Sequence, residues 1–152
     1  MTKRRPGKEN LSLRLWLHLM KCTKTIETNI GGQFRRFHRQ GLSRYDVLSQ
    51  LYRFESKWGS IGEVADQLMA AGRNITGLID RMEVDGLVER RLNPIDRRSF
   101  QMRITEEGTR IFLNMTDDHE NWIEKALSDI PSKDKEKLIE LLLRVRRAFE
   151  AC

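Results

Sequence analysis

Residues 60–111 read SIGEVADQLMAAGRNITGLIDRMEVDGLVERRLNPIDRRSFQMRITEEGTRI, and this stretch decides the fold. Ser60 and Glu63 have the spacing of a capping box, so a short helix is expected to begin there. After the small residues 70–72, a second helix is expected from Arg73 to Gly86. Its apolar residues recur at helical spacing and form one buried stripe: Ile75, Leu78, Ile79 and Met82. Two helices joined by such a tight link are typical of a helix-turn-helix.

The period of the pattern changes after Gly86, a residue that suits the left-handed position at the end of a helix. Residues 87–91 and 100–104 alternate roughly as strands do, and the polar segment 92–99 lies between them. The sequence therefore predicts a charged β-hairpin, or wing, directly after the helix-turn-helix. Thr105 is expected to cap the helix that follows, which runs to about residue 129.

Long helices are expected on both sides of this region. One runs from Leu11 to about Arg39, Ser43 then caps a second helix, and Ser132 caps the last one. That last helix is apolar on more than one face, as in helices that pack against a partner chain. The predicted fold class is mainly α with a small β-hairpin wing, a winged helix-turn-helix flanked by long dimerisation helices. The predicted domains are 1–39 (tail and dimerisation helix), 40–104 (DNA-binding domain) and 105–152 (C-terminal dimerisation helices).

Charge and composition narrow the class of function. The 152 residues carry a net charge of +6, which favours anionic partners such as nucleic acid. Residues 35–103 contain 13 Lys/Arg and 9 Asp/Glu, so much of the excess lies in the predicted DNA-binding part. The three histidines and two cysteines form no nucleophile–base pattern, and neither a Gly-rich phosphate loop nor H-E-x-x-H occurs. We therefore do not expect an enzyme.

The cysteines and the N-terminal region bear on the compartment. Cys22 and Cys152 lie far apart and do not resemble a disulfide framework, which favours a reducing, cytoplasmic location. The apolar run 11–20 is interrupted by Arg14 and His18, so it reads neither as a signal peptide nor as a membrane span.

Residues 60–111 resemble the MarR (multiple-antibiotic-resistance regulator) family. N-I-T-G-L-I-D-R-M-E-x-D-G-L-V-E-R-R is similar to that family's recognition helix and its exit, and D-R-R followed later by I-T-E-E-G is similar to its wing and fifth helix. The order of the flanking helices matches as well. The resemblance implies a homodimer whose terminal helices knot together, binding a pseudo-palindromic operator in double-stranded DNA. It also implies repression that is relieved by a small-molecule effector, often an aromatic acid.

Two details refine the resemblance. L-W-L-x-L-M near the N-terminus, together with N-I-T-G-L, is similar to a branch tied to aromatic-compound catabolism. The family often has Ser or Thr near position 71, whereas this chain has Ala71 and Gly72, so a hydroxyl cap and its phosphate or base contact are missing. The operator sequence therefore cannot be carried over from relatives.

The candidate recognition residues lie opposite the apolar stripe of the second helix. Arg73 can donate two hydrogen bonds to guanine, Asn74 can pair with adenine, and Thr76 can contact a thymine methyl or a phosphate. Gly77 would let the helix approach the groove floor, and Asp80 shares this face. The alternative is an ordinary solvated helix face.

The wing supplies the second set of candidates. Arg97 and Arg98 lie on a turn that contains Pro94, and arginine favours the narrow minor groove. The resemblance implies that Arg98 is the wing-tip arginine and that Asp96 orients the loop through an ion pair; a solvated turn is the alternative. Further candidates are side chains that could contact phosphate: Ser43, Arg44, Arg53, Arg81, Arg90 and Arg91.

In the family, the ligand pocket lies where the first, second and fifth helices meet. Thr23 and Glu27 are polar gaps in the expected inward stripe of the first helix, and buried polar groups need partners. Four more side chains could serve a carboxylate or aromatic ligand, or could instead be interface or surface residues: His18, Arg36, Tyr45 and Tyr52.

His18 and Cys22 are four residues apart, which supplies half of a metal site and no third ligand, so no metal or cofactor is predicted. Cys22 is either a buried structural cysteine or a redox-sensing thiol. The predicted function is a sequence-specific transcriptional regulator, a repressor released by an aromatic acid or aromatic acyl-CoA. The alternatives are a winged-helix protein-interaction module and a thiol-based redox regulator acting through Cys22.

Overall fold

The computed structural model describes residues 10–55, 57–68 and 74–152, and the chain divides into two compact units, 1–115 and 116–152. The elements, in chain order, are α1 (Leu11–His38), α2 (Leu42–Arg53), β1 (Gly59–Ser60), α3 (Ile61–Gln67), α4 (Ile75–Val84), β2 (Val88–Leu92), β3 (Phe100–Ile104), α5 (Glu106–Ala126) and α6 (Ser132–Glu150). This order confirms the predicted fold class, a mainly α chain with a small β-hairpin wing.

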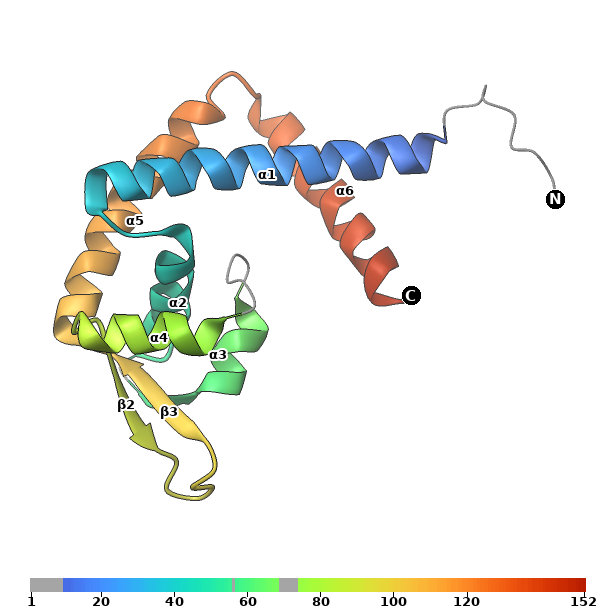
Figure 1. Cartoon of the computed structure of the whole chain (residues 1–152). Coiled ribbons are helices and arrows are strands. Elements are labelled where there is room, and N and C mark those ends of the chain that lie inside the picture. Colours follow the sequence, from blue (N-terminus) through green and yellow to red (C-terminus); the bar gives the residue numbers. More distant parts are fainter. Residues whose placement is uncertain (1–9, 56, 69–73) are drawn as a thin grey trace. The chain divides into compact units, whose positions relative to one another are not determined.

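The first unit contains a three-stranded antiparallel sheet in the order β1-β3-β2. Strand β2 pairs with β3 from Val88↔Ile104 to Leu92↔Phe100, and β1 pairs with the other edge of β3 through Gly59↔Met102. Figure 1 shows the β2–β3 hairpin projecting beyond helices α2, α3 and α4. The hairpin is the predicted wing, and its free end is the connection between β2 and β3.

One apolar core lies under the helix-turn-helix and the base of the wing. Helices α2, α3, α4 and α5 and strands β2 and β3 contribute to it, and its buried members are Val47, Leu48, Leu51, Val64, Ile79, Met82, Leu87, Val88, Met102, Ile104 and Phe112. The stripe predicted for α4 therefore faces this core, with Ile79 and Met82 fully buried. The opposite side of α4 is left for solvent or a partner.

Three predicted end signals are confirmed. The Ser60 hydroxyl accepts from the N–H of Glu63, whose carboxylate accepts from the N–H of Ser60, so the capping box begins α3. Gly86 has φ of +75°, the left-handed conformation expected after α4. Thr105 Oγ1 accepts from the N–H of Gly108 at 3.0 Å and also donates to the carbonyl of Gly86 at 2.7 Å.

Other predicted boundaries are wrong. The N-cap of α2 is Gly41, without a side-chain cap, and Ser43 lies inside the first turn. Ser132 is the first residue of α6, after Pro131 as N-cap. The short strand β1 was not expected at all, because two residues are too few to show an alternating pattern.

The flanking helices differ from this core. Only Ile30, Gly31 and Phe34 of α1 are buried, and no residue of α6 is. The expected inward stripe of the first half of α1 is therefore exposed in the single chain. Across residues 10–55, 57–68 and 74–152, no helix combines the length and the apolar character that crossing a membrane requires.

Candidate nucleic-acid interface

The N-terminus of α4 is organised by one of the predicted recognition residues. Asn74 is the N-cap, and its Oδ1 accepts from the N–H of Gly77 at 3.0 Å. A Cβ at position 77 would lie 2.8 Å from the Asn74 amide, so glycine at this position keeps room for the cap. Asn74 and Thr76 are exposed, as predicted for this face, whereas Arg73 lies outside the described residues. The Asn74 carbonyl oxygen is thus already used within the chain.

The tip of the wing is held by side-chain-to-backbone hydrogen bonds. Asp96 Oδ1 accepts from the N–H of Arg98 at 3.0 Å, and its main-chain carbonyl accepts from both the N–H and the hydroxyl of Ser99. The ion pair expected for Asp96 is wrong for the part of the chain that the structure describes, because the carboxylate caps a turn instead. Arg97 and Arg98 are exposed on this turn.

Arg90 connects the wing to α4, a role that the sequence did not reveal. Its guanidinium lies 2.8 Å from Asp80 Oδ1 and 3.1 Å from Glu83 Oε1, and the main-chain N–H of Arg90 donates to Glu83 Oε2. The hydrogen bond with Glu83 raises the pKa of the Arg90 guanidinium above its ordinary value. Arg90 therefore anchors the wing to α4 and holds Asp80, while its phosphate contact stays a prediction. The Arg90 guanidinium also lies 5.5 Å from the ring of Phe100.

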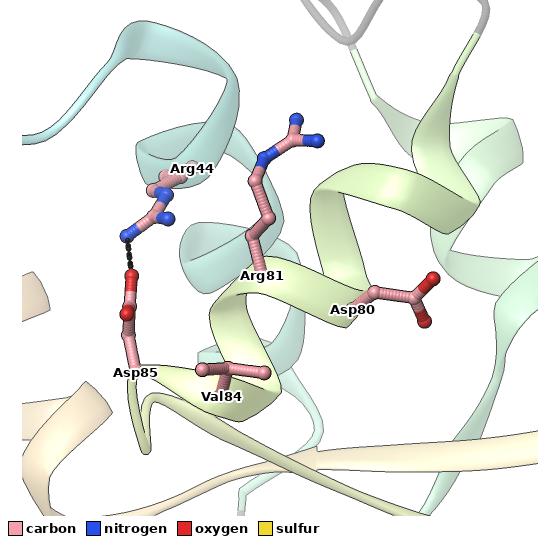
Figure 2. Close-up of a pocket in the computed structure, with 5 residues that line it drawn as sticks. All are labelled: Arg44, Asp80, Arg81, Val84 and Asp85. Atoms are coloured by element: carbon pink, nitrogen blue, oxygen red, sulfur yellow. Dashed lines mark ion pairs between the residues drawn. The ribbon is translucent and has the colours of Figure 1, made fainter.

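A second charged cluster lies between α2 and α4. Arg44 forms a 2.7 Å ion pair with Asp85 and donates to Gln40, so its cationic group is also partnered. Figure 2 shows this pair beside Arg81, which extends away from Asp80. The residues line a pocket of about 260 Å³ together with Val84. Arg81 is exposed and forms no ion pair among the described residues, which leaves its cation for an anion such as phosphate.

The outer face of the sheet carries a Trp58 stack. Arg91 and Arg103 lie 4.4 and 4.6 Å from the centre of the Trp58 ring, within cation–π distance. Arg91 also donates to Gln101, and Arg103 pairs with Glu89. Nothing in the sequence singles out Trp58, because its partners are more than thirty residues away.

The structure brings together two of the six ligand candidates. Tyr45 lies 4.7 Å from the ring of Phe34 and 5.4 Å from that of Phe112, and Tyr52 lies 5.0 Å from the same Phe112 ring. This aromatic row joins α1, α2 and the start of α5.

The other four candidates lie on α1 and are exposed. His18 precedes Phe34 by sixteen residues, about 24 Å along the helix, which is too far to share a pocket with Tyr45. Thr23 Oγ1 donates to the carbonyl of its own helix at Leu19, and Arg36 lies over Phe37. Glu27 is exposed as well.

Cys22 is exposed, so its interpretation as a buried structural cysteine is wrong for the single chain. Within the described ranges, three or more side chains of His, Cys, Asp or Glu never gather as a metal site would require.

The wing beside a helix-turn-helix, with exposed polar α4 residues and wing arginines, defines a winged-helix DNA-binding protein. The MarR family model matches residues 42–100. The HTH-type transcriptional regulator MhqR of Bacillus subtilis is 27% identical over 136 residues, covering 88% of this chain and 90% of that protein. Residues 42–100 thus carry the MarR-type DNA-binding region, and the chain is similar over most of its length to a transcriptional regulator.

Solved structures share the fold. Sco3205, a MarR family transcriptional regulator from Streptomyces coelicolor in complex with DNA, has a TM-score of 0.79 at 17% identity, over 96% of this chain and 91% of that one. The organohalide-sensing regulator RdhR-CbdbA1625, in its 2,4-dichlorophenol-bound form, has a TM-score of 0.80 at 14% identity, over 97% and 88%.

Proposed function

We propose that this regulator is a homodimeric repressor that binds a pseudo-palindromic operator and is released by a small aromatic effector. Each α4 would lie in a major groove and each wing in the adjoining minor groove, with the two recognition helices roughly 34 Å apart. In this proposal, residues 1–39 and 105–152 supply the dimer contacts and residues 40–104 bind DNA.

The observation that carries the proposal is the joint placement of α4 and the wing. Arg90 ties the two elements, so the polar face of α4 and the wing arginines are presented as one surface. Arg97 and Arg98 project from a turn that internal hydrogen bonds fix before DNA arrives. A surface held in its bound form loses little conformational entropy on binding.

The aromatic row supports the effector class. Phe34, Tyr45, Phe112 and Tyr52 form successive ring contacts where three helices meet. A flat apolar ligand could replace one of these ring contacts, and a tyrosine hydroxyl could hydrogen-bond its polar group. The similar fold of RdhR-CbdbA1625 has been solved with 2,4-dichlorophenol bound, which is a ligand of this chemistry.

The test is binding of purified protein to its upstream intergenic DNA and to a randomised DNA library, across a range of salt concentrations. Arg98→Ala should weaken binding and reduce the salt dependence by about one phosphate contact. Arg110→Ala is the matched control, because it removes the same charge from an exposed arginine of α5 that pairs with Glu107. Addition of aromatic acids and their CoA thioesters should release the complex.

Failure of the wild-type protein to select any sequence from the library would refute operator binding. Equal losses in Arg98→Ala and Arg110→Ala would show that net charge, and not the wing, supplies the affinity. Transcription in vitro from the bound promoter then distinguishes repression from activation.

A further inference from the structure

We propose that Ile95 is an apolar wing-tip contact that touches the sugar walls of the DNA minor groove and makes binding sensitive to groove shape. The inference rests on the proposed operator binding and adds a residue to it. Ile95 is 96% exposed, more than any other large hydrophobic residue that the structure describes. It lies two residues before Arg97, at the free end of the hairpin.

The tip is apolar beyond this single side chain. Leu92 and Phe100 are paired at the end of the β2–β3 ladder and are 53% and 42% exposed. Two arginines follow within the same turn, Arg97 and Arg98. Apolar side chains next to arginines are the combination that minor-groove proteins use, because the arginines meet the negative groove and the apolar groups meet sugars and base edges.

The backbone on both sides of Ile95 is fixed. Asn93 Oδ1 accepts from the N–H of Ile95 at 3.0 Å and, more weakly, from that of Asp96 at 3.4 Å. The Asn93 N–H donates to the carbonyl of Ser99 at 2.9 Å, which closes the turn. Isoleucine is itself stiff at χ1 because it is β-branched. Ile95 is thus presented in one direction, so little conformational freedom is lost when the tip docks.

The chemistry of the groove explains what Ile95 would distinguish. The walls of the minor groove are deoxyribose C–H groups, whereas the phosphates lie at its rim. A guanine adds an amino group to the groove floor, and A·T tracts are narrower. An apolar tip therefore fits a narrow A·T segment and is hindered by the guanine amino group. Ile95 would contribute sequence preference without a hydrogen bond to any base.

The experiment compares the wild type with Ile95→Ser and Ile95→Val on two versions of the library-selected site. One version has A·T base pairs under the wing, and the other has G·C base pairs there. Ile95→Ser should weaken binding to the A·T site about fivefold, as expected for roughly 40 Å² of lost apolar contact, and abolish the preference for A·T. Ile95→Val should retain most of the affinity and most of the preference for A·T, since valine is also apolar and β-branched. The salt dependence should not change, in contrast to Arg98→Ala.

Hydroxyl-radical footprinting provides a direct readout, because the radical attacks the deoxyribose. Ile95→Ser should lose protection of the sugars under the wing and keep protection under α4. Unchanged thermal unfolding would show that the variant is folded, as its 96% exposure predicts. Wild-type affinity, preference and footprint in Ile95→Ser would overturn the inference and leave operator binding intact. A wild type that binds no DNA would overturn both.

Discussion

The winged-helix region and the long flanking helices both carry apolar side chains at regular spacing, but only the first region buries most of them within the single chain. From α2 to Met115, the apolar positions at helix and strand spacing are buried against one another within one chain. In α6 and in the first nineteen residues of α1, the same kind of spacing leaves the side chains exposed. The exposed members include Leu11, Leu13, Trp16, Leu17, Met20, Ile26, Leu138, Leu141, Leu142 and Phe149.

The difference shows that periodicity identifies a buried face without identifying what buries it. The helix-turn-helix and wing make a core of their own. Each flanking helix exposes several large apolar side chains, and groups of exposed apolar side chains mark interaction sites, which is the physical reason for the proposed homodimer. Changes in the flanking helices should therefore cause loss of association, whereas changes in the winged-helix core should cause loss of folding.

The largest expected effect comes from α6. Leu142→Asp puts a charge on a face that the proposed dimer buries, so the protein should change from dimer to monomer in analytical ultracentrifugation. Operator affinity should fall by about 100-fold or more, because each half-site then binds alone. Val84→Asp is the control for association, since Val84 is 86% exposed on α4.

A monomeric wild type, or a dimeric Leu142→Asp variant with intact DNA binding, would contradict this interpretation of the exposed faces. Circular dichroism of Leu142→Asp should still show a folded winged-helix region. That result would separate lost association from lost structure.

The next effect concerns the self-contained core. Gly108 is buried in the first turn of α5, where a Cβ would collide with the carbonyl oxygen of Leu87. Gly108→Ala should lower the free energy of unfolding by about 2–3 kcal/mol, since backbone must move to admit the methyl group. Gly62→Ala is the matched control in α3, because its nearest neighbour would be Ser60 Oγ at 3.9 Å.

Urea denaturation of both variants measures the effect. Gly62→Ala should be neutral or slightly stabilising, as alanine is the better helix former. A stable Gly108→Ala variant would mean that the contact between α5 and the end of α4 can relax, against the close packing described here.

Features that depend on neighbouring residues could be predicted from the sequence, whereas contacts between residues far apart in the chain could not. Ser60 with Glu63, Gly86 and Thr105 could be identified because each acts within a few residues of itself. The alternation of the two wing strands was visible for the same reason.

The polar and charged residues of the interface were harder to interpret. Asn74, Asp96 and Arg90 were each predicted to contact DNA or to form an ion pair. A polar side chain can instead hydrogen-bond to the nearby backbone or pair with a residue of a neighbouring element. The structure uses Asn74 and Asp96 as caps. Arg90 meets Asp80 and Glu83 only because the hairpin folds back on α4. Nothing in the spacing of charges distinguishes these outcomes, since they depend on tertiary geometry.

Arg90 gives the smallest and most specific effect, at the junction between the core and the DNA surface. Arg90→Ala leaves Asp80 and Glu83 without their cation and frees the wing from α4, so operator affinity should fall about tenfold. The salt dependence should stay nearly unchanged, because this guanidinium is already paired with two carboxylates. Arg91→Ala, the neighbour stacked on Trp58, is the control for a wing arginine on the other face.

A double-mutant cycle between Arg90→Ala and Glu83→Gln should show strong coupling in DNA affinity. If the two losses simply add, or if Arg90→Ala reduces the salt dependence as Arg98→Ala does, Arg90 contacts DNA directly and the wing is positioned by other contacts.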